Sequence, residues 1–421
     1  MFYHRLIQKE IELKLKTSGA VWVYGPKFCG KTTTCMLYQK SYIKLNTKQR
    51  ITMARLNPKF ILEGEEPRLI DEWQTAPDIW NQIKESLDED YRFGRFLLTG
   101  SSTPVDKTDL YHSGAGRITP VLMRPMSLWE SLESEGRVAL SSLFDQQLDF
   151  KWELNANTSL ELVAFLMCRG GWPISVTANQ DIALEITKNY YNSLFIFEES
   201  ENERFRNKKP EVIKMILKSY ARNISSEASI STIISDVRQN NERSMDVKTF
   251  NDYLEAIKDI FIIEDLQAWN PSIRSKTSIR STPTRHFIDT SIACRALNIS
   301  PKDLMNDLET FGLFFEDFAV RDLRIYANYL GGEVRHYRDN TGLECDAILL
   351  LEDGRWGAIE IKLGGEKLIE EGASNLIRLQ NKIIEKSSEK KPSFLMVLTA
   401  TSETYIREDK VIVAPVASLK P

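Results

Sequence analysis

The chain reads Gly25-Pro26-Lys27-Phe28-Cys29-Gly30-Lys31-Thr32 near its N-terminus, and this stretch decides the fold around it. It fits the pattern G-x-x-x-x-G-K-[ST], in which glycines let backbone N–H groups turn inward around phosphate oxygens. The apolar run at residues 19–24 is typical of a buried strand, and residues 33–40 contain no glycine or proline and can form a helix. Because a helix N-terminus also attracts anions, the stretch predicts a nucleotide-binding loop.

Two side chains of this loop are expected to act directly on a nucleotide. Lys31 would reach the β- and γ-phosphates, and the hydroxyl of Thr32 would hold Mg²⁺. A chance glycine turn before a helix is the alternative, which the complete motif in this context disfavours. The predicted nucleotide-binding residues are Gly25, Pro26, Lys27, Phe28, Cys29, Gly30, Lys31, Thr32 and Thr33.

Length and composition predict several soluble domains in a reducing cytoplasm. The 421 residues exceed one ordinary core and favour two to four domains. No apolar run approaches a membrane span, and no signal-peptide core follows the first residues, so no membrane partner is expected. The five cysteines have no C-x-x-C spacing, which argues against zinc and disulfides. With a net charge of −4, any nucleic-acid surface must be a local patch.

Residues 68–74, R-L-I-D-E-W-Q, predict the second half of a phosphoryl-transfer site. Asp71 ends an apolar strand and would position Mg²⁺, while Glu72 would polarise the attacking water as general base. Solvated acids at a strand end are the alternative, but the position downstream of Lys31 favours catalysis. Residues 3–16 are expected to form a helix against the first strand, without chemistry of their own.

A third apolar strand, residues 96–102, ends in hydroxyl side chains. Thr99 and Ser101 are both candidates to sense the γ-phosphate, and one of them can instead cap the next turn. Arg117 follows in the glycine-rich loop G-A-G-R and is a candidate arginine finger, in cis or, in an oligomer, in trans. A solvated loop arginine is the equally favoured alternative.

These motifs resemble those of the AAA-like predicted ATPases of bacteria and archaea that carry a C-terminal domain of unknown function. The resemblance rests on GPKFCGKTT, LIDEWQ, FLLTGSS, GRI followed by RPMSLWE, and the turn C-R-G-G-W-P at residues 168–173. It covers most of the chain and implies ATP as the nucleotide and a helical lid over it, formed from the helical residues 155–223. No guanine-reading motif such as N-K-x-D is evident.

Residues 230–266 succeed one another as helix, helix and strand, which resembles a winged helix. The helix expected at residues 246–260 carries two basic and four acidic side chains, so it would repel phosphates. We therefore interpret it as a packing module rather than a DNA reader. The best local basic patch follows it in a linker or wing, with Arg274, Lys276, Arg280 and Arg285, and a solvated loop is the favoured interpretation of this stretch.

The C-terminal third predicts a second site from acids on neighbouring elements. Glu316 lies within an apolar helical stripe, where a carboxylate is costly unless it has a partner. Asp346, Glu360 and Lys362 form D-x₁₃-E-x-K on two strands that flank Glu352-Asp353-Gly354, a hairpin signal. This resembles the restriction-endonuclease-like PD-(D/E)xK core, although Glu344-Cys345 stands in place of the proline. The alternative is an amphipathic hairpin with a salt bridge at its strand end.

The resemblance assigns chemistry to these residues. Asp346 and Glu360 would hold Mg²⁺, with Glu316 as an acid from the preceding helix, and Lys362 would orient the attacking water. A three-residue loop would place Asp346 opposite Glu360 on one face of the sheet, whereas a two-residue turn would separate them. The nuclease interpretation therefore requires the three-residue loop.

The sequence thus predicts an α/β protein of four parts. These are a P-loop NTPase domain of AAA-like type (1–145), a helical lid (146–225), a winged-helix-like module and linker (226–285) and a restriction-endonuclease-like α/β domain (286–421). The expected function is Mg²⁺-dependent ATP hydrolysis coupled to a nuclease-like domain that cleaves DNA or RNA. The alternative is a nucleotide-controlled switch that binds nucleic acid or protein without cleavage.

Overall fold

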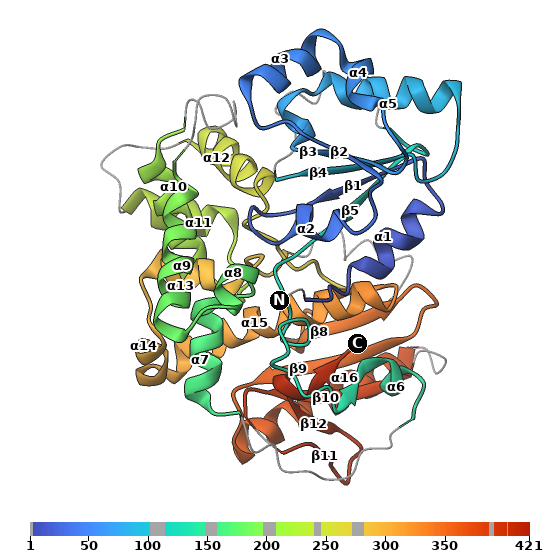
Figure 1. Ribbon diagram of the computed structural model, residues 1–421. Coiled ribbons are helices and arrows are strands. Elements are labelled where there is room, and N and C mark those ends of the chain that lie inside the picture. Colours follow the sequence, from blue (N-terminus) through green and yellow to red (C-terminus); the bar gives the residue numbers. More distant parts are fainter. Residues whose placement is uncertain are drawn as a thin grey trace. The chain divides into compact units, whose positions relative to one another are not determined.

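The computed structural model describes residues 3–101, 114–147, 158–196, 208–239, 246–271, 282–386, 391–401 and 403–421. The chain divides into two compact units (Figure 1). The first contains Met1–Pro125, Asn192–Ile213 and Asn251–Ile262. The second contains Met126–Tyr191, Lys214–Phe250 and Ile263–Pro421.

The first unit is built on a five-stranded parallel sheet with the order β2-β3-β4-β1-β5. Its central strands β1 and β4 are almost wholly apolar, as expected when helices cover both faces of a parallel sheet. Because β4 lies between β1 and β3, the carboxyl ends of these three strands are neighbours. The strands are β1 (Ala20–Tyr24), β2 (Ser41–Lys44), β3 (Arg68–Asp71), β4 (Phe96–Gly100) and β5 (Ile118–Leu122).

Helices lie on both sides of this sheet (Figure 1). The pair α1 and α2 lies on one side and α3, α4 and α5 on the other. On the side of α5, Trp73 and Trp80 stack at 5.0 Å between ring centroids, and Trp22 meets both rings edge-on. The helices are α1 (Gln8–Leu15), α2 (Lys31–Cys35), α3 (Lys48–Leu56), α4 (Pro58–Leu62) and α5 (Asp78–Glu89).

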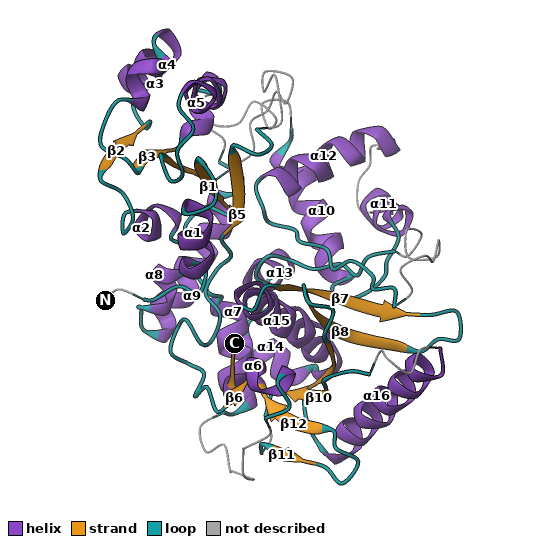
Figure 2. Ribbon diagram, turned by 90° about the vertical axis from the view of Figure 1, so that its right-hand side faces the viewer, coloured by secondary structure: helices purple, strands orange, loops and turns teal. Residues whose placement is uncertain are grey.

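The second unit contains a mixed six-stranded sheet with the order β11-β12-β10-β9-β8-β7 (Figure 2). The hairpin strands β7, β8 and β9 are antiparallel, whereas β10 runs parallel to β9 and to β12. Helix α15 (Leu308–Tyr329) packs against β7, β8 and β9, and α16 (Glu366–Lys386) packs against β8, β9 and β10. The strands are β7 (Gly332–Arg338), β8 (Glu344–Leu351), β9 (Trp356–Lys362), β10 (Phe394–Thr399), β11 (Tyr405–Ile406) and β12 (Ile412–Pro415).

Residues that follow Pro125 pack with the C-terminal part of the chain. Strand β6 (Val138–Ala139) pairs in parallel with β13 (Leu419–Lys420), and α6 (Leu140–Phe144) follows β6. The Phe144 ring meets that of Phe394 edge-on. The N-terminal segment of the first unit therefore ends at Pro125, whereas the predicted ATPase domain extended to residue 145, because residues 126–145 belong to the second unit, where β6 pairs with the C-terminal β13.

Helices α7 to α12 carry the predicted lid and winged-helix segments, and α13 and α14 begin the part predicted to be restriction-endonuclease-like. Helix α7 packs against α13, α14 and α15 within the second unit, and a role as a lid over the nucleotide stays a prediction. The helices are α7 (Leu160–Arg169), α8 (Pro173–Val176), α9 (Gln180–Ser193), α10 (Pro210–Arg222), α11 (Ile230–Gln239), α12 (Val247–Asp259), α13 (Thr290–Leu297) and α14 (Pro301–Asn306).

Antiparallel bridges follow α12 at Ile263–Phe287 and Leu266–Thr284, an order compatible with a winged helix, which also stays a prediction. Arg285 does not contribute to an exposed basic patch, because it is buried and pairs with Asp265 at 2.8 Å. The other three residues of that patch, Arg274, Lys276 and Arg280, lie outside the described residues.

A buried charge network anchors the segment after β5 to α15. The guanidinium of Arg321 lies 3.0 Å from Asp289 and 2.7 Å from Asp322, and all three side chains are at most 2% exposed. The second oxygen of Asp322 accepts the backbone N–H of Leu128 at 2.8 Å. Buried charges are costly unless paired in this way. The RPMSLWE motif thus has a structural role, because its backbone satisfies an acid of α15.

The glycine-glycine turn between α7 and α8 joins the same network. The Gly171 N–H donates to Asp289 at 2.9 Å, and a Cβ at Gly171 would lie 2.1 Å from the Met126 carbonyl oxygen. Trp172 donates its indole N–H to Ser291 at 3.0 Å. Only glycine at position 171 permits this approach of two backbone segments.

We expect Gly171→Ala to destabilise the second unit by about 1–3 kcal/mol, because the added methyl group would have to displace backbone. Gly312→Ala on α15 is the matched control, since a Cβ there meets nothing within 4 Å. Removing a helix-interior glycine should stabilise the protein by about 0.5–1 kcal/mol. Thermal and urea unfolding measure both changes, and equal effects of the two substitutions would contradict the packing described here.

Candidate functional site

The glycine loop joins β1 to α2 and needs glycine at both of its ends. Gly25 has a φ of +144°, and a Cβ on it would lie 2.2 Å from the Met123 carbonyl oxygen. Gly30 has a φ of +99° and forms the N-cap of α2. The strand, loop and helix follow in the predicted order, but the helix is shorter than expected and ends at Cys35.

Lys31 lies inside this loop. Its ammonium donates to the carbonyl oxygens of Gly25 at 2.9 Å and Pro26 at 2.8 Å, and the residue is only 7% exposed. An ammonium can only donate hydrogen bonds, so it needs oxygen acceptors around it. The two loop carbonyls supply them here, and phosphate oxygens are the acceptors that the loop motif predicts for Lys31.

The carboxylate of Asp71 brings three predicted residues together at the carboxyl ends of β3 and β4. The hydroxyls of Thr32 and Thr99 donate to the same oxygen of Asp71, at 2.9 and 2.5 Å, and Asp71 is 1% exposed. The sheet order explains this meeting, because β4 is inserted between the strands that carry the loop and Asp71. A hydroxyl and a carboxylate this close are suitable ligands for Mg²⁺.

Two residues of β2 that the sequence analysis did not select also contact Asp71. The Tyr42 hydroxyl donates to the second oxygen at 3.2 Å, and the Lys44 ammonium lies 3.7 Å from it. Burial and the charge of Asp71 raise the pKa of Tyr42 to about 12, so its hydroxyl remains a donor at neutral pH. No motif marks these positions, since β2 contacts the site only through its place beside β3.

Glu72, the predicted base, has a left-handed backbone with φ +60°. Its N–H donates to the Thr99 carbonyl oxygen at 2.9 Å, and its carboxylate accepts the Gln74 amide at 2.5 Å. A non-glycine residue is strained in this conformation, and such strain is common near functional sites. Gln74 is therefore a further residue that orients Glu72, and it belongs to the quoted LIDEWQ motif.

Arg117 lies at the other end of the sheet from the glycine loop. Its carbonyl oxygen accepts the N–H of Ala20, the first residue of β1, and its guanidinium pairs with Asp88. Because β5 runs parallel to β1, about five residues of strand separate Arg117 from Gly25, or roughly 16 Å. The structure thus contradicts an arginine finger in cis, whereas a role in trans stays a prediction.

Arg5 was missed by the sequence analysis, which expected residues 3–16 only to pack. Its guanidinium donates to the carbonyl oxygens of Cys29 at 2.7 Å and Arg124 at 2.8 Å, and the residue is 4% exposed. It thereby ties the glycine loop to the segment after β5. No sequence signal marks an arginine with this role.

The second candidate site lies on the β8–β9 hairpin. Ala347 pairs with Ile359, and the Leu351 N–H donates to the Arg355 carbonyl oxygen at 2.9 Å, which encloses a three-residue loop. Gly354 closes the loop with a φ of +87°. The register predicted from the sequence is confirmed, although Asp-Gly alone favours the shorter turn.

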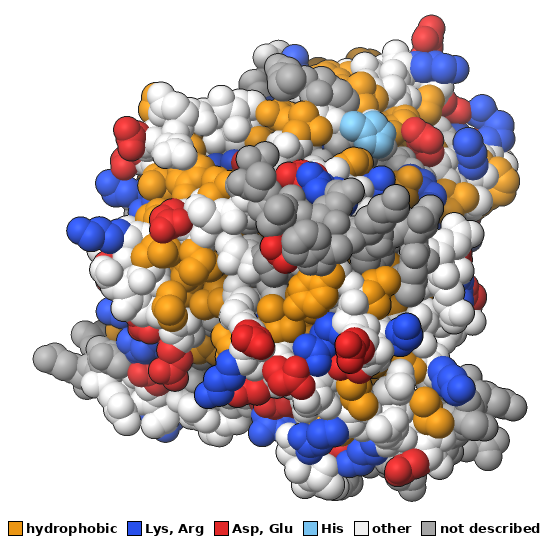
Figure 3. Space-filling model, turned by 90° about the horizontal axis from the view of Figure 1, so that it is seen from below, with side chains coloured by type: hydrophobic (Ala, Val, Ile, Leu, Met, Phe, Trp, Pro, Cys, Tyr) orange, Lys and Arg blue, Asp and Glu red, His pale blue; other side chains and the backbone are white. Residues whose placement is uncertain are grey.

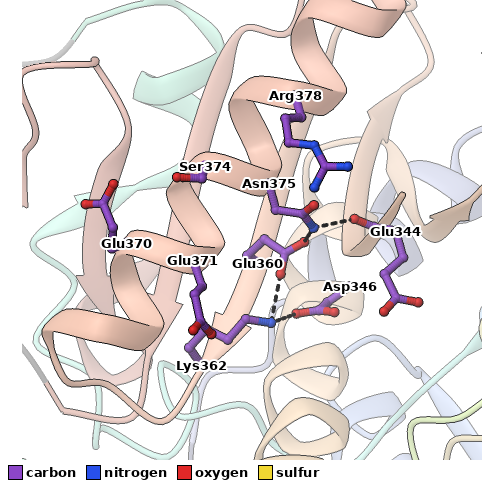
Figure 4. Close-up of a pocket in the computed structure, with 9 residues that line it drawn as sticks. All are labelled: Glu344, Asp346, Glu360, Lys362, Glu370, Glu371, Ser374, Asn375 and Arg378. Atoms are coloured by element: carbon purple, nitrogen blue, oxygen red, sulfur yellow. Dashed lines mark hydrogen bonds and ion pairs between the residues drawn. The ribbon is translucent and has the colours of Figure 1, made fainter. Parts of the chain in front are cut away.

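Lys362 bridges the two acids of this site (Figure 4). Its ammonium lies 3.1 Å from Asp346 and 2.7 Å from Glu360, and Asp346 also accepts the Ile361 N–H at 2.7 Å. The three side chains line a pocket of about 480 Å³. The pocket is lined by Glu344, Asp346, Glu360, Lys362, Glu370, Glu371, Ser374, Asn375 and Arg378.

Burial and mutual charge control protonation in the pocket. Burial, and then the charge of Asp346, raise the pKa of Glu360 to about 8. Burial alone would lower the pKa of Lys362, but the two carboxylates outweigh it and raise that pKa. Glu316 on α15 is near enough that the charge of Asp346, added to burial, raises its pKa well above the usual range. Glu316 is not among the nine described residues that line the pocket.

The carboxylates of Asp346 and Glu360 fit Mg²⁺ better than a metal ion that is held by three or more protein ligands. Within the described residues there is no cluster of three or more His, Cys, Asp or Glu side chains that could hold a metal ion. Mg²⁺ usually takes one or two carboxylates and keeps several waters, so Asp346 and Glu360 are sufficient for it. Lys362 would then have to give up part of its contact with both acids.

Three stretches of the chain match protein-family models. Residues 17–132 match the AAA domain, residues 160–303 match a domain of unknown function (DUF8612), and residues 311–419 match another (DUF4143). The N-terminal match supports the predicted AAA-like NTPase fold for this part of the chain. The C-terminal match names no activity, so the restriction-endonuclease-like domain stays a prediction.

Relatives and solved structures are distant. The uncharacterized proteins Mb2031c of Mycobacterium bovis and Rv2008c of Mycobacterium tuberculosis are each 24% identical over 356 residues, or 83% of this chain and 71% of theirs. The Walker-type ATPase PABY2304 of Pyrococcus abyssi is 14% identical with a TM-score of 0.44, covering 70% of this chain and 96% of its own.

Surface features add two observations. Among the residues the structure describes, no helix combines the length and apolar character that crossing a membrane needs. On the face shown in Figure 3, acidic and basic side chains lie side by side, so that face does not carry charge of one sign.

We expect Glu360 to make the free energy of unfolding of the metal-free protein fall as the pH rises from about 4.5 to about 8. The folded state holds the proton of Glu360 up to the higher pKa, whereas the unfolded state releases it near the lower one, so deprotonation favours unfolding. Melting temperatures from pH 5 to 9 in a chelating buffer should therefore fall more steeply for the parent than for Glu360→Gln. Parallel curves would show that Glu360 has an ordinary pKa.

Proposed function

We propose that this protein is a Mg²⁺-dependent ATPase and that its glycine loop, Asp71 and Glu72 form the hydrolytic site. The observation that carries the proposal is that the hydroxyls of Thr32 and Thr99 both donate to the buried carboxylate of Asp71. Thr32 and Asp71 would hold Mg²⁺, which neutralises charge on the β- and γ-phosphates. The hydroxyl of Thr99, on the strand between β1 and β3, would contact the γ-phosphate and so sense whether it is present.

The protein's own groups supply the remaining steps. Lys31 exchanges the carbonyl oxygens of Gly25 and Pro26 for phosphate oxygens, which bind an ammonium more strongly because they are charged. Glu72, oriented by Gln74, takes a proton from the water that attacks the γ-phosphorus. Arg5 keeps the loop in place through the Cys29 carbonyl and does not need to touch the nucleotide.

A second function, metal-dependent cleavage of nucleic acid, is supported by a separate observation. Asp346, Glu360 and Lys362 meet in one pocket, which the alternative of a simple strand-end salt bridge does not require. The two carboxylates would hold Mg²⁺, and Lys362 would orient a water or offset charge on the reacting phosphate. The competing proposal is a nucleotide-controlled switch that binds DNA, RNA or protein, in which the C-terminal acids are structural.

For the ATPase, we expect Lys31→Ala to abolish detectable ATP binding, because backbone N–H groups alone cannot balance the phosphate charge. Glu72→Gln should bind ATP normally but turn over at least about a hundred-fold more slowly, because it lacks only the base. Lys40→Ala, which removes an exposed positive charge outside the loop, is the control. Binding of a fluorescent ATP analogue and phosphate release measure these effects. Parent-like hydrolysis by Glu72→Gln would refute the assignment of the base.

For the second site, we expect the parent to cleave single- or double-stranded DNA or RNA only with Mg²⁺ or Mn²⁺, tested with and without ATP. Glu360→Ala should lower the rate at least about a hundred-fold, since it removes a metal ligand. Glu352→Ala, an exposed acid in the same hairpin loop, should cleave like the parent. Cleavage by none of the proteins under any of these conditions would favour the switch.

A further inference from the structure

Helix α16 closes one side of the acidic pocket. Five of the nine lining residues come from this helix, and their spacing places them along one face of it. Gly372 lets the helix approach, because a Cβ there would lie 3.3 Å from the side chains of both Glu360 and Val397. The chemistry proposed for this site uses only the strand residues Asp346, Glu360 and Lys362 and assigns no part to this helical wall. The five residues are Glu370, Glu371, Ser374, Asn375 and Arg378.

Asn375 links the helix to both strands of the site. Its amide nitrogen donates at 2.7 Å to a carboxylate oxygen of Glu360 and at 2.7 Å to the carbonyl oxygen of Glu344. Both amide hydrogens are thereby used. The other oxygen of Glu360 contacts Lys362 at 2.7 Å, so each oxygen of this carboxylate has a fixed partner. Figure 4 shows Glu360 between Asn375 and Lys362, with a dashed line to each.

Arg378 differs from the other charged side chains of the pocket. Glu370 lies 2.8 Å from Arg407, Glu371 lies 3.9 Å from Lys367, and Glu344 lies 3.5 Å from Arg338. Asp346 and Glu360 share Lys362. Arg378 lines the same pocket and has neither an ion pair nor a side-chain hydrogen bond with any residue that the structure describes. Its planar donor fork is available to a ligand.

The charge of the pocket restricts what that ligand is. Five acids and two bases line it, so an anion approaching the carboxylates is repelled unless cations offset them. A metal ion offsets part of that charge, and Arg378 on the helical wall offsets a further part. An arginine fork matches the non-bridging oxygens of a phosphodiester, which it binds with two parallel hydrogen bonds.

We propose that α16 forms the substrate wall of this site: Arg378 binds a backbone phosphate of a nucleic-acid strand, and Asn375 positions Glu360 for the metal ion. The inference rests on the proposed second function and extends it to the recognition of substrate. Arg378 is a binding residue. Asn375 is a positioning residue, because it acts through Glu360.

The test of Arg378 measures binding of fluorescent single- and double-stranded oligonucleotides by anisotropy, in Ca²⁺ and over a range of salt concentrations. Arg378→Ala should weaken binding at least about fivefold and reduce the slope of log K against log salt by about one, as expected for one lost phosphate contact. Lys367→Ala is the matched control, since it removes one positive charge from the same helix outside the pocket. It should bind like the parent.

The outcomes separate the two levels of the proposal. If the parent binds and the two variants weaken binding equally, or not at all, Arg378 is not the phosphate ligand, while the proposed function stands. If the parent binds neither oligonucleotide, the nucleic-acid function itself is wrong. A loss confined to Arg378→Ala supports both.

Asn375 is tested by titrating Mn²⁺ alone into the protein and measuring heat. Asn375→Ala should bind Mn²⁺ about tenfold more weakly, because a ligand loses the partner that orients it. Asn381→Ala, which removes an exposed amide from the same helix outside the pocket, should bind like the parent. Melting temperatures are measured in parallel, and a weaker Mn²⁺ affinity at an unchanged melting temperature supports positioning. If Asn375→Ala bound Mn²⁺ as tightly as the parent, Asn375 would have only a structural role and would not position Glu360 for the metal ion.

Discussion

The nucleotide site depends on the buried carboxylate of Asp71. Thr32, Thr99 and Tyr42 donate to it, and Lys44 lies close to it, so side chains from three elements, α2, β2 and β4, converge on one carboxylate. A charge this deeply buried is stable only when such donors surround it. The parallel sheet provides them, because neighbouring parallel strands end at the same edge. In the proposed function, the arrangement that solvates Asp71 also prepares a site for Mg²⁺.

In the second site the central charge is positive, and acidic side chains stabilise it. Lys362 lies between two carboxylates, and the hairpin register decides that they share a face. Helix α16 contacts the site through Asn375, and α15 packs on the same sheet while its Asp322, paired with Arg321, accepts the Leu128 N–H after β5. Helix α15 carries Glu316 as well, so one element serves both the buried network and the surroundings of the pocket.

Sequence reasoning locates residues where a motif or a period carries the information. The glycine loop, Asp71 at the end of β3, Thr99 on β4 and the three-residue hairpin loop are local features that neighbouring residues predict, and the catalytic roles of these residues stay predictions. It failed where the contact is made by distant backbone: Arg5 reaches the carbonyls of Cys29 and Arg124, and β6 pairs with the C-terminal β13. Arg117 illustrates the same limit, because only the strand direction shows that it lies far from the loop.

The most direct test of the central claim is a crystal structure with Mg²⁺ and a non-hydrolysable ATP analogue. The account predicts that the Lys31 ammonium leaves the carbonyl oxygens of Gly25 and Pro26 and contacts the β- and γ-phosphates. Mg²⁺ should lie between the Thr32 hydroxyl and Asp71, with Glu72 facing the γ-phosphate. A bound nucleotide that leaves Lys31 on the two carbonyls, with the metal ion away from Asp71, would contradict it.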